Sequence, residues 1–175
     1  MYVRLYDYIN KMGILYPDQY GFQASHSTAM SLRNIHDKIS LAFDNNEYSL
    51  GVFLDLSKAF DIVNHKILLK KLELYGIRGI PLLWFENYLL SRQQQVWCNG
   101  KLSNFRFVEH GVPQGSILGL LLFLLNINDL PNATPLLHFV GLLFADDSNV
   151  FASHGFLWNT IPNNQHWVTT GKWLV

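Results

Sequence analysis

The chain of 175 residues is poor in several features that define familiar classes of protein. Its single cysteine, Cys98, excludes an intrachain disulfide, and no apolar run reaches the roughly 18 residues that a membrane-spanning helix needs. Charged residues make up only 15% of the chain, and 13 Lys and Arg residues balance 13 Asp and Glu residues. Bulk charge therefore gives no indication of a polyanionic partner such as nucleic acid.

Apolar side chains are plentiful: 49% of the residues are hydrophobic and 14% are aromatic. This composition excludes an intrinsically disordered chain, and the length suits one domain with a buried core. The N-terminal stretch MYVRLYDYIN lacks the basic-then-apolar order of a signal peptide. We expect an intracellular protein with no membrane partner. The sequence has no basic cluster that resembles a nuclear localisation signal, so nuclear and cytoplasmic locations are equally open.

Helical and strand patterns alternate along the chain. Apolar residues with helical spacing predict four helices before residue 92, and the leucine-rich run Ile117–Leu125 has the length of a buried helix or strand. Capping and turn residues mark the helix ends: Gly13, Ser27, Asp44, Asn64, Gly76 and Pro81. The seven histidines show no metal-ligand spacing, so we expect His26 and His65 at the surface or as capping groups.

Three segments predict antiparallel strands. SLGVFLDL is an apolar run of strand length, Asn99-Gly100 is a strong hairpin signal, and Leu136–Ala152 has the pattern of two strands joined by an Asp-Asp turn. Helices combined with an antiparallel sheet define an α+β fold, which we expect to form a single domain.

Two adjacent carboxylates, Asp146 and Asp147, interrupt the apolar stretch LLFADDSNVF. Asp is a common turn residue, so a hairpin turn is an ordinary explanation. A third aspartate, Asp55, follows the apolar run GVFL, where a buried carboxylate needs pairing or a metal to offset its desolvation. If the two strands are neighbours, the three carboxylates converge on one point.

Converging carboxylates are suitable ligands for Mg²⁺, which combines a few carboxylates with water and substrate phosphates. Two such ions about 4 Å apart can clamp the attacking and leaving oxygens of a phosphoryl displacement. The loop GVPQGS, shaped by Gly111, Pro113 and Gly115, precedes a helix and exposes backbone N–H groups that can face a phosphate or a base. In isolation, such a loop is equally typical of an ordinary turn.

The motifs FLDLSKAFD, GVPQGSILG and LFADD occur in this order, with helical segments between the first two. The phrases QYGFQASHST, LLKKLELYGIRG and FLLNINDLP accompany them. With these motifs the sequence resembles the reverse transcriptase domain of non-LTR retrotransposons of the jockey/chicken-repeat type, over about Leu15 to Ser153. The resemblance implies a right-hand polymerase palm with partial fingers and no thumb: fingers-derived helices at 1–50, palm at 51–153 and a weakly patterned tail at 154–175.

The resemblance also implies site residues. Asp55, Asp146 and Asp147 are the expected catalytic and metal-binding aspartates, with two Mg²⁺ ions as cofactors and Mn²⁺ as an alternative. Phe60 matches the aromatic residue that abuts the incoming sugar and excludes a ribose 2′-hydroxyl, while Gln114 and Gly115 match the loop that touches nucleotide and template.

The implied reaction is attack of a primer 3′-hydroxyl on the α-phosphate of a deoxynucleoside triphosphate, with pyrophosphate as the leaving group. The expected partners are an RNA template, a DNA primer and deoxynucleoside triphosphates.

The chain departs from the family pattern in ways that weaken this expectation. Gln23 stands where the family usually has a basic residue that grips the triphosphate, and Leu120 stands where it usually has proline. The tail only faintly resembles the expected helix, and the chain carries no net charge. We expect weak nucleic-acid binding and reduced or no activity, as in a truncated copy that self-associates through the surface exposed by truncation.

The alternative is a noncatalytic remnant or binding module of retroelement origin. A third possibility, a cyclase-like palm, also presents carboxylates on a hairpin but has no place for GVPQGS.

Overall fold

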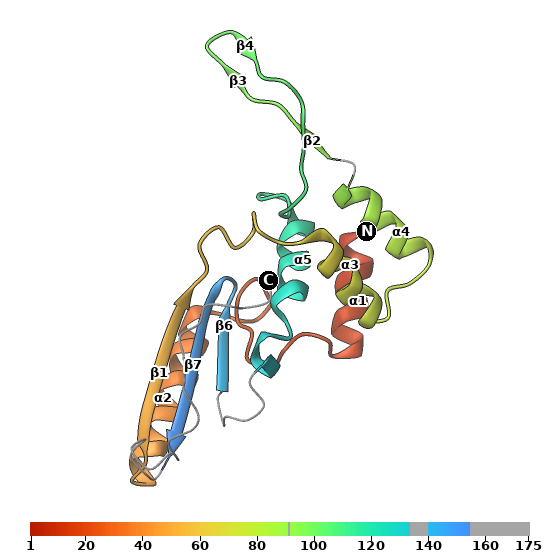
Figure 1. Ribbon diagram of the computed structural model, residues 1–175. Coiled ribbons are helices and arrows are strands. Elements are labelled where there is room, and N and C mark those ends of the chain that lie inside the picture. The colour runs from red at the N-terminus through yellow and green to blue at the C-terminus, as the bar shows by residue number, and fades with distance from the viewer. Residues whose placement is uncertain (91, 134–139, 155–175) are drawn as a thin grey trace, which may run out of the picture. The chain divides into compact units, whose positions relative to one another are not determined.

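Figure 1 shows the computed structural model of the chain, which describes residues 1–90, 92–133 and 140–154. Helices and antiparallel strands are mixed, so the expected α+β class is confirmed. The chain forms two compact units: a first unit of Met1–Tyr16 with Ser57–Asn128, and a second unit of Pro17–Leu56 with the chain from Asp129 onward. The division into fingers and palm at residue 50 stays a prediction. Among the described residues, no helix is long and apolar enough to cross a membrane.

The core of the first unit is helical. The leucine-rich run forms α5, in which eight of 11 residues are buried, because a helix with apolar residues on most of its surface must be covered on several sides. Helix α3 packs against α4 and α5, and α1 packs against α5. The helices of this unit are α1 (Tyr2–Met12), α3 (His65–Leu74), α4 (Ile80–Leu90) and α5 (Ile117–Ile127).

The caps that the sequence predicts for these helices are formed. Gly13 ends α1 in a left-handed conformation with φ of 59°, which glycine adopts without steric cost. The Asn64 side chain accepts hydrogen bonds from the N–H groups of Lys66 at 2.9 Å and Ile67 at 3.2 Å, and so caps α3. The boundaries of these helices therefore follow from local sequence.

Replacing Asn64 with Ala should lower the free energy of unfolding by about 1 kcal/mol, because two N–H groups of α3 lose their acceptor. Urea unfolding followed by circular dichroism measures this change. Asn104→Ala, at an exposed position outside every helix, is the matched control. Equal midpoints for the two variants would contradict the capping role.

A hairpin extends the first unit between α4 and α5 (Figure 1). Asn99 and Gly100 form its two-residue turn with φ of 48° and 77°, the signs that a type I′ turn requires. The predicted hairpin is thus confirmed. Its strands pair β2 with β5 and β3 with β4, the bounds being β2 (Gln93–Gln94), β3 (Trp97–Cys98), β4 (Lys101–Leu102) and β5 (Arg106–Phe107).

The second unit contains a three-stranded antiparallel sheet with strand order β1-β7-β6. The strands are β1 (Tyr48–Asp55), β6 (Val140–Phe144) and β7 (Asp147–His154), and a 3₁₀ turn, η1 (Leu130–Ala133), precedes β6. The predicted pair of strands within 136–152 is therefore present from Val140 onward, while 136–139 and the tail after His154 lie outside the described residues.

Helix α2 (Thr28–Asp44) contacts β1 and β6. Its start is fixed by Ser27, whose hydroxyl accepts a hydrogen bond from the N–H of Met30 at 3.3 Å. Under the helix, Tyr20 and Phe151 are buried against Ile35 and Ile39. This small core attaches the helix to the sheet and places the N-terminal turn of α2 beside the strand ends that carry the aspartates.

Candidate active site

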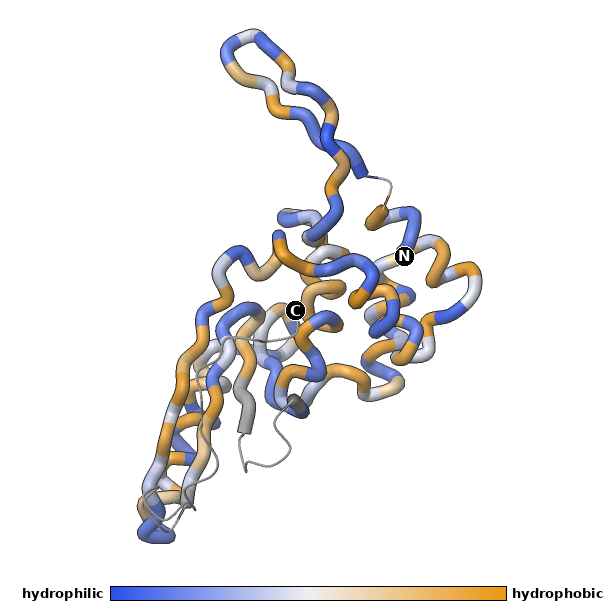
Figure 2. Tube along the Cα trace, viewed as in Figure 1, coloured by the Kyte–Doolittle hydropathy of each residue, from blue (hydrophilic) through white to orange (hydrophobic). Residues whose placement is uncertain are grey.

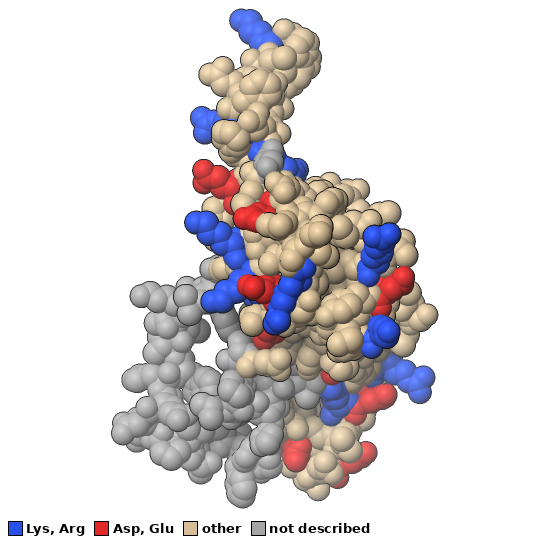
Figure 3. Space-filling view, turned by 90° about the vertical axis from the view of Figure 1, so that its right-hand side faces the viewer, with Lys and Arg blue, Asp and Glu red and all other residues tan. Residues whose placement is uncertain are grey.

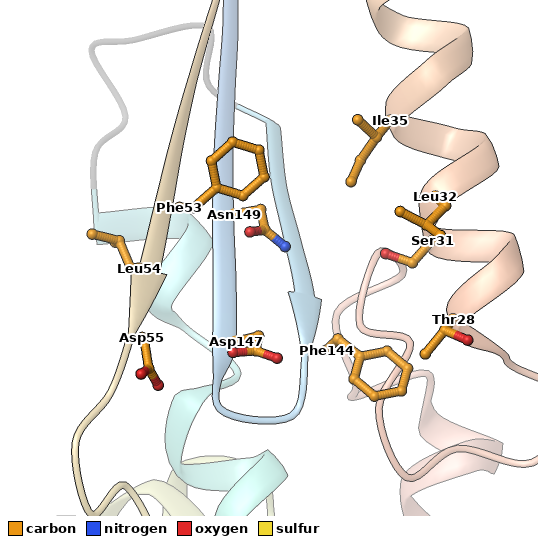
Figure 4. Close-up of a pocket in the computed structure, with 10 residues that line it drawn as sticks. All are labelled: Thr28, Ser31, Leu32, Ile35, Phe53, Leu54, Asp55, Phe144, Asp147 and Asn149. Atoms are coloured by element: carbon orange, nitrogen blue, oxygen red, sulfur yellow. The ribbon is translucent and has the colours of Figure 1, made fainter.

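Asp55 and Asp147 face each other at one end of the sheet. Strands β1 and β7 pair antiparallel over their whole length, and Asp55 opposite Asp147 is the last pair of the ladder. Directly opposed residues of an antiparallel pair share a face of the sheet. In Figure 4 the two carboxylates accordingly point to the same side, so strand register alone brings together two residues far apart in the sequence.

Both aspartates line a pocket of about 470 Å³ between the sheet and α2 (Figure 4). Its remaining polar lining consists of hydroxyls near the start of α2 and one amide on β7, and its apolar lining comes from both layers. The lining residues are Thr28, Ser31, Leu32, Ile35, Phe53, Leu54, Asp55, Phe144, Asp147 and Asn149. The site is thus an acidic end of a mostly apolar pocket.

Burial does not explain Asp55, and that part of the sequence argument is wrong. Asp55 and Asp147 are both exposed, and Asp146 is partly exposed. β1 is an edge strand, and seven of its eight residues are exposed. An apolar run in the sequence is compatible with such a strand as well as with a buried one. What favours a cation here is the repulsion between two carboxylates held opposite each other.

The third aspartate, Asp146, lies in the turn between β6 and β7. Within 1–90, 92–133 and 140–154, no group of three His, Cys, Asp or Glu side chains is placed to hold a metal ion. The structure therefore brings Asp55 and Asp147 together but does not assemble the expected three-carboxylate cluster. The role of the three as metal ligands stays a prediction.

A buried glutamine, Gln19, braces the turn that carries Asp146. Its side-chain oxygen accepts hydrogen bonds from the N–H groups of Gly21 at 2.8 Å and Ala145 at 3.1 Å, and the residue is only 2% exposed. Ala145 has φ of 57°, a conformation that costs a non-glycine residue energy and needs support from its surroundings. Gln19 supplies such support directly before Asp146.

The same segment adds backbone contacts to β6. Tyr20 donates its N–H to the carbonyl of Leu143 at 2.7 Å, and Leu143 donates its N–H to the carbonyl of Asp18 at 2.9 Å. Gly21 passes so close that a Cβ there would lie 2.2 Å from the nitrogen of Ala145. The sequence patterns did not single out Gln19, and its only signal is its place in the phrase QYGFQASHST.

Gln23 belongs to the same unit as the three aspartates. It is partly buried, and its side-chain amide donates a hydrogen bond to the carbonyl of Gln19 at 2.6 Å. The position at which the family usually has a cation is therefore linked to the segment that braces Ala145. The predicted contact of Gln23 with a nucleotide is not tested by this geometry.

The other predicted binding residues, Phe60, Gln114 and Gly115, belong to the first unit. Gln114 and Gly115 are exposed, and the Gln114 amide donates to the carboxylate of Asp61 at 3.0 Å. The Phe60 ring lies against Phe123 with ring centroids 4.2 Å apart. Phe60 is thus partly a core residue, while the amide of Gln114 faces the surface.

Backbone hydrogen bonds tie the GVPQGS loop to the segment after Phe60. Val112 donates to the carbonyl of Phe60 at 2.8 Å, and Gly111 donates to the carbonyl of Val63 at 2.8 Å. His65 is 1% exposed, and its Nε2 lies 2.8 Å from the carbonyl oxygen of Gly111, so the expectation of a surface histidine is wrong. These contacts bring Phe60 and Gln114 together, as the motif order alone could not show.

Fold and site together define a class: an α+β chain with two aspartates opposed at the ends of neighbouring antiparallel strands and a third in the turn before the second strand. The family described as reverse transcriptase (RNA-dependent DNA polymerase) matches residues 2–157 of the chain. The chain belongs to this family. The relatives below identify it further as a reverse transcriptase domain of the non-LTR retrotransposon type, which confirms the resemblance seen in the sequence.

Three relatives illustrate the similarity. The chain is 35% identical over 150 residues to the probable RNA-directed DNA polymerase from transposon X-element of Drosophila melanogaster, covering 83% of this chain and 16% of that protein. It is 35% identical over 117 residues to the RNA-directed DNA polymerase from mobile element jockey of the same species, covering 67% and 13%.

The Retrovirus-related Pol polyprotein from type-1 retrotransposable element R2 of Popillia japonica is 30% identical over 110 residues, covering 55% of this chain and 18% of that protein. The chain therefore spans less than a fifth of the length of each of these relatives.

Proposed function

We propose that this chain performs RNA-templated DNA synthesis, in which the 3′-hydroxyl of a primer attacks the α-phosphate of a deoxynucleoside triphosphate and pyrophosphate leaves. The observation that carries the proposal is the opposed pair of Asp55 and Asp147 lining one pocket, in a chain of the reverse transcriptase family. In this proposal the sheet and its aspartates form part of a polymerase palm, and α2 derives from the fingers.

The donor set suits Mg²⁺. Two exposed carboxylates leave room for the several waters and substrate phosphates that Mg²⁺ retains, which is how this ion is usually bound. Asp55 and Asp147 would hold the metal with Asp146 beside them, as one or two ions, Mn²⁺ being an alternative. When bound, the metal supplies the positive charge that stabilises the attacking and leaving oxygens.

The chain's own residues have separate tasks in the proposed reaction. The carboxylates of Asp55 and Asp147 would hold the metal that the phosphates of the nucleotide contact, and Gln19 holds Asp146 in place through Ala145. Phe60 stays the residue that the resemblance assigns to the sugar of the nucleotide, and Gln114 and Gly115 stay those that it assigns to nucleotide and template.

Primer extension on an RNA template with Mg²⁺ and the four deoxynucleotides tests the proposal on the purified chain. Product that requires both Mg²⁺ and the RNA template supports it. Absence of product from a chain shown by circular dichroism to be folded would contradict it.

In the same assay, Gln23→Arg should lower the KM for deoxynucleotides by about five- to tenfold. A charge-assisted hydrogen bond to phosphate is about 1 kcal/mol stronger than a neutral one, and about 1.4 kcal/mol is a factor of ten. Asn87→Arg, which adds the same charge on the exposed surface of α4, is the control. Equal KM values for both variants would show that position 23 does not contact the nucleotide.

A noncatalytic binding module is the second candidate function. It is favoured by the neutral Gln23, whose amide is already engaged by the carbonyl of Gln19, and by the net charge of zero. A folded chain that binds oligonucleotide but gives no product, even with Gln23→Arg, would support this candidate.

A further inference from the structure

The hairpin of residues 92–108, called the hairpin arm below, exposes aromatic side chains that the described part of the protein does not cover. Trp97, Phe105 and Phe107 are 66%, 67% and 67% exposed. Large aromatic side chains at this exposure are not part of a core, and apolar surface of this kind marks an interaction site. Figure 2 shows hydrophobic and hydrophilic residues interleaved along the arm.

The hairpin arm also carries an excess of positive charge. It contains Arg92, Lys101 and Arg106 and has no Asp or Glu. None of the three forms an ion pair with a carboxylate among the described residues, and Lys101 and Arg106 are exposed. In Figure 3 the outer part of the arm carries blue side chains and no red one. The charge of the arm therefore complements an anionic partner.

Strand register gives each short ladder one aromatic and one basic residue, on opposite faces of the ribbon. Near the turn, Trp97 pairs with Leu102 on one face, and Cys98 pairs with Lys101 on the other. The ribbon is only two strands wide, about 5 Å between strands, so a long basic side chain on one face reaches the edge of the other.

The second short ladder repeats this arrangement. Gln93 pairs with Phe107, and Gln94 pairs with Arg106. Each ladder thus contains one exposed aromatic side chain and one cation, each paired with a residue on the opposite strand.

This combination fits single-stranded nucleic acid better than other anions. Unpaired bases stack on exposed aromatic side chains, while their phosphates are neutralised by nearby Lys and Arg. An acidic peptide would satisfy the cations but would leave the three aromatic rings without a matching partner. A duplex would contact the cations, but its bases are already stacked and cannot use the rings.

We propose that the hairpin arm is a binding site for single-stranded nucleic acid, with Trp97, Phe105 and Phe107 stacking on bases and Lys101 and Arg106 neutralising phosphates. The proposal does not rest on catalysis, because the arm contains none of the aspartates. It names a second contact region for the template class that the proposed function requires.

Fluorescence anisotropy of a labelled 12-nucleotide single-stranded RNA, titrated with the whole chain, tests the proposal. Trp97→Ala combined with Phe107→Ala should weaken binding by at least about tenfold, because each lost stack lowers the affinity by a factor of about 5 to 150. Leu83→Ala, which removes an exposed apolar side chain from α4, is the control and should leave the affinity unchanged. Circular dichroism confirms that each variant is folded.

Salt dependence tests the role of the cations. Lys101→Gln with Arg106→Gln should reduce the slope of log K against log salt by about 1.4, or about 0.7 for each phosphate contact on a single strand. Lys66→Gln with Lys70→Gln removes the same charge from exposed positions on α3 and should change the slope less.

Three results would overturn the proposal. The first is an aromatic variant that binds the RNA as tightly as the unmodified chain, and the second is an unlabelled duplex that competes as well as a single strand. The third is light scattering that shows the arm joining two copies of the chain, with an RNA affinity that the arm variants leave unchanged. RNA affinity tests the arm and primer extension tests the catalytic proposal, so failure of the arm proposal and failure of the catalytic proposal give different results.

Discussion

Asp147→Asn is expected to reduce Mg²⁺-dependent primer extension by at least about a thousandfold. Asp147 provides one of the two opposed carboxylates of the pocket, and an amide in its place binds a divalent cation weakly. A metal ion contributes several kcal/mol to stabilising a phosphoryl-transfer transition state, and each 1.4 kcal/mol or so is a factor of ten in rate. Asp55→Asn and Asp146→Ala should be similarly inactive, measured as product per enzyme at saturating nucleotide.

The same substitution should stabilise the metal-free protein. Like charges directly opposed across two strands are destabilising by about 0.2 to 1 kcal/mol, and the exposure of both groups places the effect at the lower end. Asp147→Asn should therefore melt at a slightly higher temperature than the unmodified chain when EDTA is present. Mg²⁺ should raise the melting temperature of the unmodified chain and leave that of the variant unchanged.

Asp7→Asn, at an exposed position on α1, is the matched control for both measurements. It should keep its activity and its response to Mg²⁺. A fully active Asp147→Asn enzyme would contradict the proposed site. An inactive variant that still gains stability from Mg²⁺ would place the metal elsewhere.

Gln19→Leu is expected to lower the free energy of unfolding by about 1 to 3 kcal/mol. Leucine fills a similar volume but leaves the N–H groups of Gly21 and Ala145 buried without an acceptor, and each such group costs about 1 to 3 kcal/mol. The substitution also removes the amide nitrogen of Gln19, which is buried without a partner among the described residues, and this offsets part of the cost. Loss of this brace also frees the turn before Asp146, so activity at a temperature where the variant is folded should fall more than the folded fraction does.

Gln19→Glu separates hydrogen bonding from charge. This substitution keeps an acceptor oxygen but introduces a carboxylate at a position that is only 2% exposed and contacts the turn before Asp146. It should therefore also be destabilising. Gln93→Leu, at an exposed position of the hairpin arm, should change stability by less than about 0.5 kcal/mol. A Gln19→Leu variant as stable as this control would show that Ala145 does not depend on the brace.

Local sequence predicted most of the elements, because their ends are set by residues that act on their immediate neighbours. Ser27 and Asn64 cap helices through their own side chains, and Asn99-Gly100 forms the turn between β3 and β4. The sequence predicted that Asp55 and the aspartates of the turn would converge only if their strands were neighbours. The structure shows that β1 and β7 are paired, and this pairing places Asp55 opposite Asp147.

What the sequence could not supply depends on contacts between distant segments. The apolar residues of β1 indicated a buried strand, but β1 lies at the edge of the sheet and Asp55 is exposed. His65 and Gln19 are buried because Gly111 and Ala145, remote in the chain, offer them backbone partners. No local pattern carries that information, since the backbone groups that accept or donate these hydrogen bonds lie on distant segments.

The pairing of β1 with β7 has a consequence for how the protein forms during synthesis. Asp147 emerges from the ribosome roughly 90 residues after its partner Asp55, which at about 5 to 20 residues per second is a delay of roughly 5 to 20 seconds. Meanwhile the exposed apolar residues of β1 have no strand to pair with, while α3, α4 and α5 can already pack. All the helices of the first unit are therefore available to pack before β7 has been made, and the aspartate pair is completed only after that.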